Sequence, residues 1–197
     1  MEFRPDRNDL RANLSRTSEG VYQAMNKVEL RLSRPLLDQI LQDLRRPHQF
    51  AAERVGFAWG VFEDDADSKN LILMNGYEPV EEPHYIDDPT VGVRISGDAI
   101  RWAMQLALDK SPERTCVFHV HLHDFKGKPR PSRIDCAEIP PVVRSIARLA
   151  PDVPHGFIIL SVNSISAWML PPGSDKLVEA SCFVCGWPSI LVEGTVK

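Results

Sequence analysis

Cysteine is scarce in this chain of 197 residues, which has only Cys116, Cys136, Cys182 and Cys185. Four thiols in a chain of this length are too few for a disulfide-stabilised scaffold. Long apolar runs are also missing, and none approaches the roughly 18 residues that a membrane-spanning helix needs. The first residues, MEFRPDRNDLRANLSR, are charged from the start and lack the apolar stretch of a secretory signal. We therefore expect a soluble protein of a reducing cytoplasm.

The chain has no large excess of charge of one sign. Its formal net charge is −4 and its pI is about 5.9, which argues against nucleic acid as the main ligand. The apolar content of 43% and charged content of 25% are ordinary for a globular protein, and the length suits one domain. Residues 1–27 are polar and lack periodicity, so we expect an N-terminal arm, either partly helical or mobile, followed by a domain over residues 28–197.

The hydrophobic pattern predicts strands and helices that mix without regular βαβ alternation. Strands are expected over 28–33, 53–64, 70–80, 90–95, 114–123, 156–162, 165–170, 179–187 and 189–194. Helices are expected between Ser33 and Pro47, over 97–110, and after residue 131 with an interruption near Pro140 and Pro141. The strands on either side of the polar turn DDADSKN are expected to pair antiparallel. This order indicates an α/β or α+β protein whose mixed or antiparallel sheet is flanked by helices.

The stretch HVHLHDFKGKPRPSRID contains three of the six histidines. In a strand, His119, His121 and His123 share one face, because side chains alternate between the two faces. Neutral imidazoles that project together can bind zinc, which also accepts carboxylate ligands. Asp135 is the obvious third ligand, and the fourth position would remain for water, as in a catalytic zinc site. His121 and His123 lie nearest the loop, so His119 is expected to be a supporting or core residue.

Ordinary structural explanations stand beside this hypothesis. A single His-x-His pair is common by chance, and Ser132-x-x-Asp135 is in outline a capping box at a helix start. The two explanations of Asp135 are compatible, because a helix start holds a ligand rigidly. Glu53 opens the predicted strand ERVGFAWG and is our candidate proton acceptor, although an acid in that place is often only a solvated strand end.

Taken together, these residues resemble the JAMM motif of the JAB/MPN metalloprotease family over roughly residues 28 to 175. The matching positions are Glu53-x-x-Gly56-x-x-x-Gly60, His121-x-His123 and Pro131-Ser132-x-x-Asp135. The sequence departs from the family pattern in two places. Asp124 stands where proline usually follows the second histidine, and the loop to Ser132 is one residue longer, so the contribution of Asp124 stays open.

The resemblance implies a JAB/MPN-like fold, which is related to the cytidine-deaminase-like fold. It implies one zinc ion per chain, held by His121, His123 and Asp135. It also implies that Glu53 is the general acid/base and that Ser132 helps to stabilise the oxyanion of the tetrahedral intermediate. The implied reaction is hydrolysis of an amide or isopeptide bond by zinc-activated water, without a covalent intermediate.

The resemblance further implies a substrate class. Small prokaryotic members of the family occur beside ubiquitin-like proteins and their activating and conjugating enzymes. We therefore expect the bond after the C-terminal tail of a ubiquitin-like protein to be cut, with the tail lying along a sheet edge or groove. Lys126, Lys128 and Arg130 lie in the neighbouring loop, where they are either solvated or form a clamp for an acidic surface or a C-terminal carboxylate.

Two other classes of function were weighed. Zinc-dependent deamination needs His-x-Glu and Pro-Cys-x-x-Cys, whereas Ser181 precedes Cys182-x-x-Cys185 here and no His-x-Glu occurs. The cysteine pair is expected to be buried on a strand rather than to form a second metal site. A non-catalytic JAB/MPN scaffold in a multiprotein assembly is the alternative, and metal analysis of the purified protein separates it from the enzyme.

Overall fold

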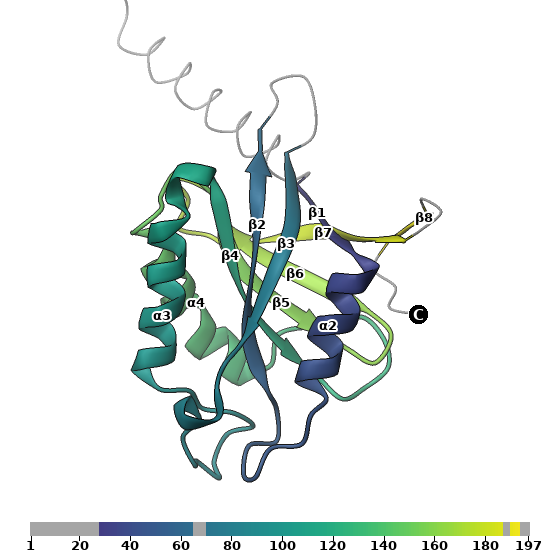
Figure 1. The fold of residues 1–197 in the computed structure, drawn as a ribbon, viewed down its shortest axis with the longest axis vertical. Helices are drawn as coiled ribbons and strands as arrows, with labels where there is room; N and C mark the ends of the chain where they lie inside the picture. Colours follow the sequence, from purple (N-terminus) through teal and green to yellow (C-terminus); the bar gives the residue numbers. More distant parts are fainter. Residues whose placement is uncertain (1–27, 65–69, 187–189, 194–197) are drawn as a thin grey trace, which may run out of the picture.

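A computed structural model describes residues 28–64, 70–186 and 190–193 (Figure 1). The expected N-terminal arm, residues 1–27, lies outside this described part. No helix in the described ranges is long and apolar enough to cross a bilayer.

Seven strands form a closed mixed β-barrel. They follow the order β1-β3-β2-β4-β5-β6-β7, and β7 pairs with β1 to close the ring, while β8 pairs with β7 outside it. The strands are β1 (Glu29–Ser33), β2 (Val55–Glu63), β3 (Leu71–Pro79), β4 (Thr115–Leu122), β5 (His155–Leu160), β6 (Ile165–Leu170), β7 (Val178–Gly186) and β8 (Ile190–Glu193). The predicted antiparallel pairing of β2 and β3 is confirmed, and so is the mixed α/β class.

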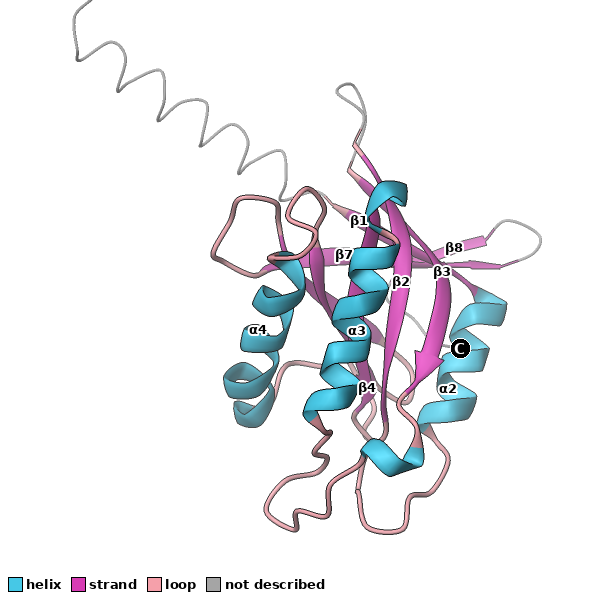
Figure 2. Cartoon of the chain, turned by 60° about the vertical axis from the view of Figure 1, so that its left-hand side comes forward, coloured by secondary structure: helices cyan, strands magenta, loops and turns pink. Residues whose placement is uncertain are grey.

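Three helices flank the barrel: α2 (Arg34–Leu44), α3 (Gly97–Asp109) and α4 (Arg133–Ala147). Two short 3-10 helices, η1 (Glu82–His84) and η2 (Ser111–Glu113), lie in the connections. In Figure 1, α2 lies on one side of the barrel and α3 and α4 on the other, and Figure 2 shows α3 and α4 side by side.

Strand β4 separates two hydrophobic cores. Its inward side chains Cys116, Phe118 and Val120 join the core that also contains the leucine face of α2. Val117, on the opposite face, joins a core formed with the alanines of α3 and with Ile146 of α4. The alternation therefore sends the odd-numbered side chains of β4, including the histidines, toward the α3 and α4 side of the barrel.

The prediction of a strand over residues 90–95 is wrong. This segment belongs to a loop, and its regular pairing is limited to an isolated antiparallel bridge between Tyr85 and Ile95. A local turn competes with the strand: the Asp88 carboxylate accepts hydrogen bonds from the Thr90 amide (3.0 Å) and hydroxyl (2.6 Å), and it pairs with Arg94 (2.8 Å). The alternation of apolar residues in this segment therefore belongs to a loop whose apolar side chains lie on one side.

The predicted interruption of the last helix is also wrong, because α4 continues through Pro140 and Pro141. Each proline removes one helical N–H, so the carbonyl groups of Cys136 and Ala137 lose their usual donors. Both of those residues are exposed, which leaves their carbonyl groups accessible to solvent. On the opposite face Ile139, Val143 and Ile146 are buried, and this packing keeps the helix together.

His155 is a fully buried histidine at the start of β5. Its Nδ1 accepts a hydrogen bond from the Val117 amide (3.1 Å), so the proton lies on Nε2, which donates to the Ala150 carbonyl (2.9 Å). Burial lowers the pKa of His155 to about 4. The folded protein therefore holds this ring neutral at pH values where an unfolded chain would already protonate it.

We predict that His155 makes folding sensitive to acid. Between an unfolded pKa of about 6.5 and the folded value the unfolded state binds the extra proton, so stability falls as pH falls through that window, by up to about 3 kcal/mol. His155→Gln should lower stability at pH 7.5 but show a smaller further loss by pH 4, as measured by urea unfolding. His84→Gln, at a partly exposed histidine, is the control, and an unchanged pH dependence in His155→Gln would contradict the prediction.

Candidate metal centre

The register of β2 against β4 places an acid beside the predicted histidines. Val55 pairs with His121 in this antiparallel pair, so residues that precede Val55 run alongside residues that follow His121. Ligand atoms of Glu53, His121 and His123 all lie within 4.8 Å of one another. Glu53, found in the sequence as an acid before an apolar strand, therefore joins a group of side chains that could hold a metal ion.

His121 and His123 converge through the same ring atom. Their Nε2 atoms are 3.1 Å apart and their ring centroids 4.9 Å apart. His123 follows the last residue of β4, but its amide still donates to the Leu160 carbonyl of β5 (2.9 Å), so the strand geometry extends to it. The predicted shared face is therefore present, and the strand fixes the spacing of the two rings.

Asp135 lies in the first turn of α4 and faces the same two rings. Its Oδ1 is 3.4 Å from His121 Nε2, and its Oδ2 is 3.4 Å from His123 Nε2. The predicted capping box is also present, because the Ser132 amide donates to Asp135 Oδ2 (2.6 Å) and the Asp135 amide donates to Ser132 Oγ (3.1 Å). The Asp135 carboxylate thus takes part in the N-terminal cap of α4 and also approaches the histidine pair.

The loop between His123 and Ser132 is tied to the turn between β5 and β6. The Gly127 amide donates to Asn163 Oδ1 (2.7 Å), the Ser161 hydroxyl donates to the Gly127 carbonyl (2.6 Å), and the Val162 amide donates to the Phe125 carbonyl (2.9 Å). These contacts hold the first half of the loop, at Phe125 and Gly127. The longer loop therefore does not prevent Asp135 from reaching the histidines.

The Nε2 atoms of His121 and His123 have the spacing that a small tetrahedral cation needs. Zinc bonds of about 2.0–2.1 Å place neighbouring ligand atoms about 3.3 Å apart in a tetrahedron, and the two Nε2 atoms are 3.1 Å apart. Each Nε2 atom also lies 3.4 Å from a different oxygen of Asp135, and four acceptor atoms so close together repel one another unless a proton or a metal ion lies between them. The group with the spacing of a metal site consists of Glu53, His121 and His123, so Glu53 is a candidate ligand as well as Asp135.

The two carboxylates have opposite electrostatic environments. Burial raises the pKa of Glu53, although the two histidines act against this shift, and Asp135 adds to it. Burial acts in the same direction on Asp135, but hydrogen bonds from His121 and Ser132 outweigh it and hold the pKa of Asp135 below its usual range. Asp135 is therefore the stable anion, and Glu53 is the carboxyl group that exchanges a proton more readily.

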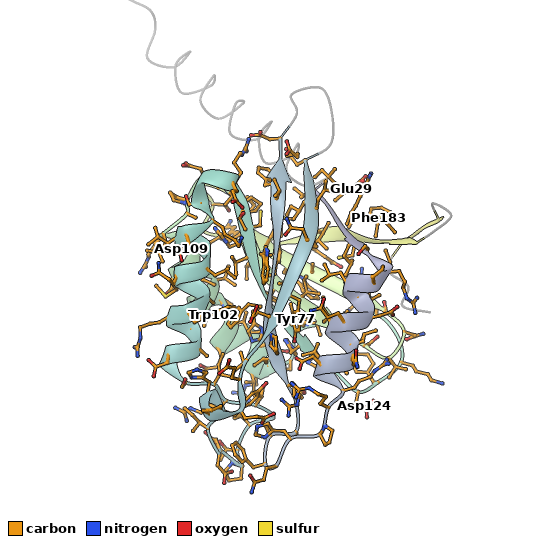
Figure 3. All side chains as sticks on the ribbon, viewed as in Figure 1. Glu29, Tyr77, Trp102, Asp109, Asp124 and Phe183 are labelled. Atoms are coloured by element: carbon orange, nitrogen blue, oxygen red, sulfur yellow. The ribbon has the colours of Figure 1, made fainter. Side chains whose placement is uncertain are left out.

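His119 and Asp124, whose contributions were left open, occupy different surroundings. The His119 ring is half-buried and lies edge-on to Phe57 (5.7 Å between centroids) and 5.4 Å from His121. Burial lowers the pKa of His119 to about 3, so the ring is neutral. Asp124 is exposed, is labelled toward the lower right of Figure 3, and does not line the cleft over the centre.

A cleft of about 920 Å³ opens over the centre between α3, α4 and the loop of residues 86–96. Much of its wall comes from that loop. Because the loop was expected to be a strand, nothing in the sequence connected it with the site. The cleft is lined by Glu53, Val55, Asp88, Val91, Gly92, Val93, Arg94, Ile95, Ile100, His119, His121, His123, Ser132, Arg133, Ile134, Asp135, Ala137, Glu138, Ile139 and Val142. The turn residues of PTVG were the available indication of a loop.

The other polar candidates lie apart from the centre. Cys182 is buried on β7 and Cys185 is half-buried, and all four cysteines are free thiols. Among the residues that the structure describes, the group around Glu53 is the one cluster with the spacing of a metal site. Lys128, proposed as part of a clamp, pairs with Glu179 of β7 (2.7 Å).

Comparison with known proteins adds no family assignment, since no family model matches the sequence and no curated protein is significantly similar to it. The assignment of a function therefore depends on the residues of the centre and their geometry.

We predict that Asp135 and Glu53 differ in their effect on metal binding. Asp135→Ala should lower zinc affinity by more than the 10- to 100-fold that is typical of losing a supporting residue. Glu53→Gln should retain zinc, and Glu138→Gln, at another acid of the cleft, is its control. Zinc content after dialysis and competition with a chromogenic chelator measure the effect. A loss of zinc in Glu53→Gln with none in Asp135→Ala would assign the ligands the other way.

Proposed function

We propose that this protein is a zinc-dependent peptidase or isopeptidase of the JAMM type. The observation that supports the proposal most is the convergence of His121 and His123 with the carboxylate of Asp135, and the half-buried carboxyl group of Glu53 beside the two histidines. When bound there, zinc would lower the pKa of a bound water to about 7 and polarise a substrate carbonyl group. Under this proposal the barrel is a JAB/MPN-like fold.

Glu53 is placed to transfer protons. Its carboxyl group lies at the floor of the cleft beside both histidines, and burial raises its pKa from the ordinary value. A carboxylate with a raised pKa is a stronger base, so it takes a proton from the attacking water more readily. The same group then carries this proton to the leaving amine as the amide bond breaks.

Ser132 is placed to donate a hydrogen bond. Its Oγ accepts the Asp135 amide (3.1 Å), which leaves the hydroxyl hydrogen free to point away from the helix. Ser132 is exposed and lines the cleft. The hydroxyl can therefore stabilise negative charge on the substrate carbonyl oxygen as the tetrahedral intermediate forms.

The loop of residues 86–96 offers a backbone edge for an extended substrate. The bonds from the Ile86 amide to the Arg94 carbonyl and from the Ser96 amide to the His84 carbonyl use one edge of the segment. Val93 and Ile95, whose backbone groups alternate with these, line the cleft and have no backbone partner in the described part of the chain. The barrel strands beside the centre are paired on both edges, so strand addition at this loop is the route we propose.

A tail that binds in this way must be extended up to the scissile bond. The C-terminal tail of a ubiquitin-like protein has this shape, and we propose such a protein, or its conjugates, as the substrate in deconjugation or precursor processing. The activating and conjugating enzymes of the same system are the proposed partners, and the cytoplasm is the proposed compartment.

We predict that Glu53→Gln abolishes cleavage while zinc stays bound. Loss of a general acid/base lowers kcat by about 100- to 10,000-fold. The assay mixes zinc-loaded protein with ubiquitin-like proteins fused at their C-terminal tails and follows the products by gel and mass spectrometry. Glu138→Gln should cleave normally. Cleavage by Glu53→Gln at the wild-type rate would refute the role of Glu53, and zinc-free wild-type protein would support the scaffold instead.

We predict a separate effect for Ser132, which is both a helix cap and a donor. Ser132→Ala should lower kcat by up to about 100-fold because one donor to the oxyanion is lost, and loss of the cap should cost about 1 kcal/mol of stability. Ser33→Ala, which removes the matching cap of α2, should cost similar stability without loss of kcat. Ser132→Thr should restore both. Equal rate losses in Ser132→Ala and Ser33→Ala would show that Ser132 acts through stability alone.

A further inference from the structure

Glu53 lies in a segment that has no regular secondary structure. Residues 45–54 connect α2 to β2 as turns and bends. A base that must reach a water molecule needs its position fixed, since a displacement of about 1 Å can cost about 100-fold in rate. The contacts that fix this segment therefore bear directly on the proposed chemistry.

Arg54, the next residue along the chain, folds the segment back on itself. Its side chain is 4% exposed. The Nε atom donates to the Arg46 carbonyl (2.8 Å), and Nη2 donates to the Pro47 carbonyl (2.9 Å) and to the carboxylate of Glu82 in η1. One buried guanidinium thus joins both ends of the segment to the connection between β3 and α3.

His48 meets the same carboxylate from the other side. Its side chain is 3% exposed, and its Nδ1 accepts the amides of Phe50 (3.3 Å) and Ala51 (3.1 Å). In the neutral ring the proton must then lie on Nε2, which is 2.8 Å from Glu82 Oε2. Glu82 therefore accepts a hydrogen bond from Arg54 on one oxygen and lies close to His48 Nε2 with the other, so it lies between two buried side chains of the segment.

Two further contacts continue this support along the chain. The Tyr85 hydroxyl accepts the Val55 amide (3.1 Å) and donates to the Val55 carbonyl (3.2 Å), and the Tyr85 ring packs on His48 (4.4 Å between centroids). On the cleft side, the amides of Ala52 (2.8 Å) and Glu53 (3.3 Å) donate to the Gly92 carbonyl. Residues 52–54 are thus held by side chains and loops, and the strand pairing begins only at Val55.

We propose that His48, Arg54 and Glu82 form a positioning unit that sets the place of Glu53, with Glu82 as its hub. None of the three lines the cleft, so they act through the backbone on either side of Glu53 and not on a substrate or a metal ion. The Arg54 guanidinium holds the pKa of Glu82 below its ordinary value, which keeps the hub ionised. The unit is a device of the same centre and rests on the proposed function.

Glu82→Gln tests the unit, because the Glu82 side chain is 56% exposed and its loss leaves the cores intact. We expect kcat on the ubiquitin-like fusion to fall by about 10- to 100-fold, with KM and zinc affinity unchanged. Hydrogen exchange followed by mass spectrometry should show faster exchange of the amides of residues 50–55. Arg54→Lys, which keeps the charge but not the fork of donors, should behave in the same way.

Asp38→Asn is the matched control, since it breaks an exposed pair with Arg34 on α2 (2.9 Å) and should leave kcat and exchange unchanged. An unchanged kcat in Glu82→Gln, an equal loss in Asp38→Asn, or a kcat loss that follows loss of zinc would overturn the unit. If the wild-type protein cuts no fusion, the proposed function is refuted. The hydrogen-exchange measurement alone then tests the positioning unit. Unchanged exchange of residues 50–55 in Glu82→Gln would then overturn the positioning unit.

Discussion

The antiparallel pairing of β2 with β4 is the constraint on which the centre depends. With Val55 opposite His121, the acid two residues before Val55 meets the histidine two residues after His121. A slip of one residue in β4 would turn the histidines into the core with α2, away from Glu53. Gly60 helps to hold the sheet together on the other edge of β2, because a Cβ there would lie 2.4 Å from the Leu73 carbonyl oxygen of β3. The backbone hydrogen bonds between these strands therefore determine how precisely Glu53 is positioned against the histidines.

The start of α4 adds a second constraint, which couples helix formation to the centre. The hydrogen bonds between Ser132 and Asp135 satisfy donors at the helix start and also fix the carboxylate that faces His121 and His123. A side chain fixed in this way loses little conformational freedom when it binds an ion. The parallel connection from β4 through α4 to β5 brings this helix start to the carboxyl end of β4. The capping motif and the proposed ligand motif therefore share Asp135.

The sequence was informative where the controlling interactions are local. Alternation in β4 predicted the shared face of the histidines, and the Ser132-x-x-Asp135 spacing predicted the helix start, because both patterns depend on neighbouring residues. The segment 90–95 was mistaken for a strand because its alternation is real, while the Asp88 turn that overrides it is a side-chain effect. Pro140 and Pro141 were expected to break α4, but packing of the buried face outweighed the lost hydrogen bonds.

Contacts between distant segments could not be read in this way. His48, Arg54 and Glu82 come from the loop after α2, the approach to β2 and η1, and no spacing in the sequence joins them. Closure of the barrel through β1 and β7 was likewise not predicted, since strands from opposite ends of the described chain carry no mark of their pairing. The sequence predicted the candidate residues of the centre, and the fold shows which contacts fix the backbone on either side of Glu53.

The pairing of β1 with β7, which closes the barrel, also determines when folding can be completed during synthesis. Glu29 must find Ser181, so the ring stays open until nearly all of the described chain has left the ribosome. The elements of the centre, from Glu53 to α4, emerge well before that point and pair mainly with one another. Closing so long a loop is slow, and until it closes β1 presents an unpaired edge to other chains. A nascent chain would thus carry the nearly formed candidate metal centre inside a fold still vulnerable to aggregation.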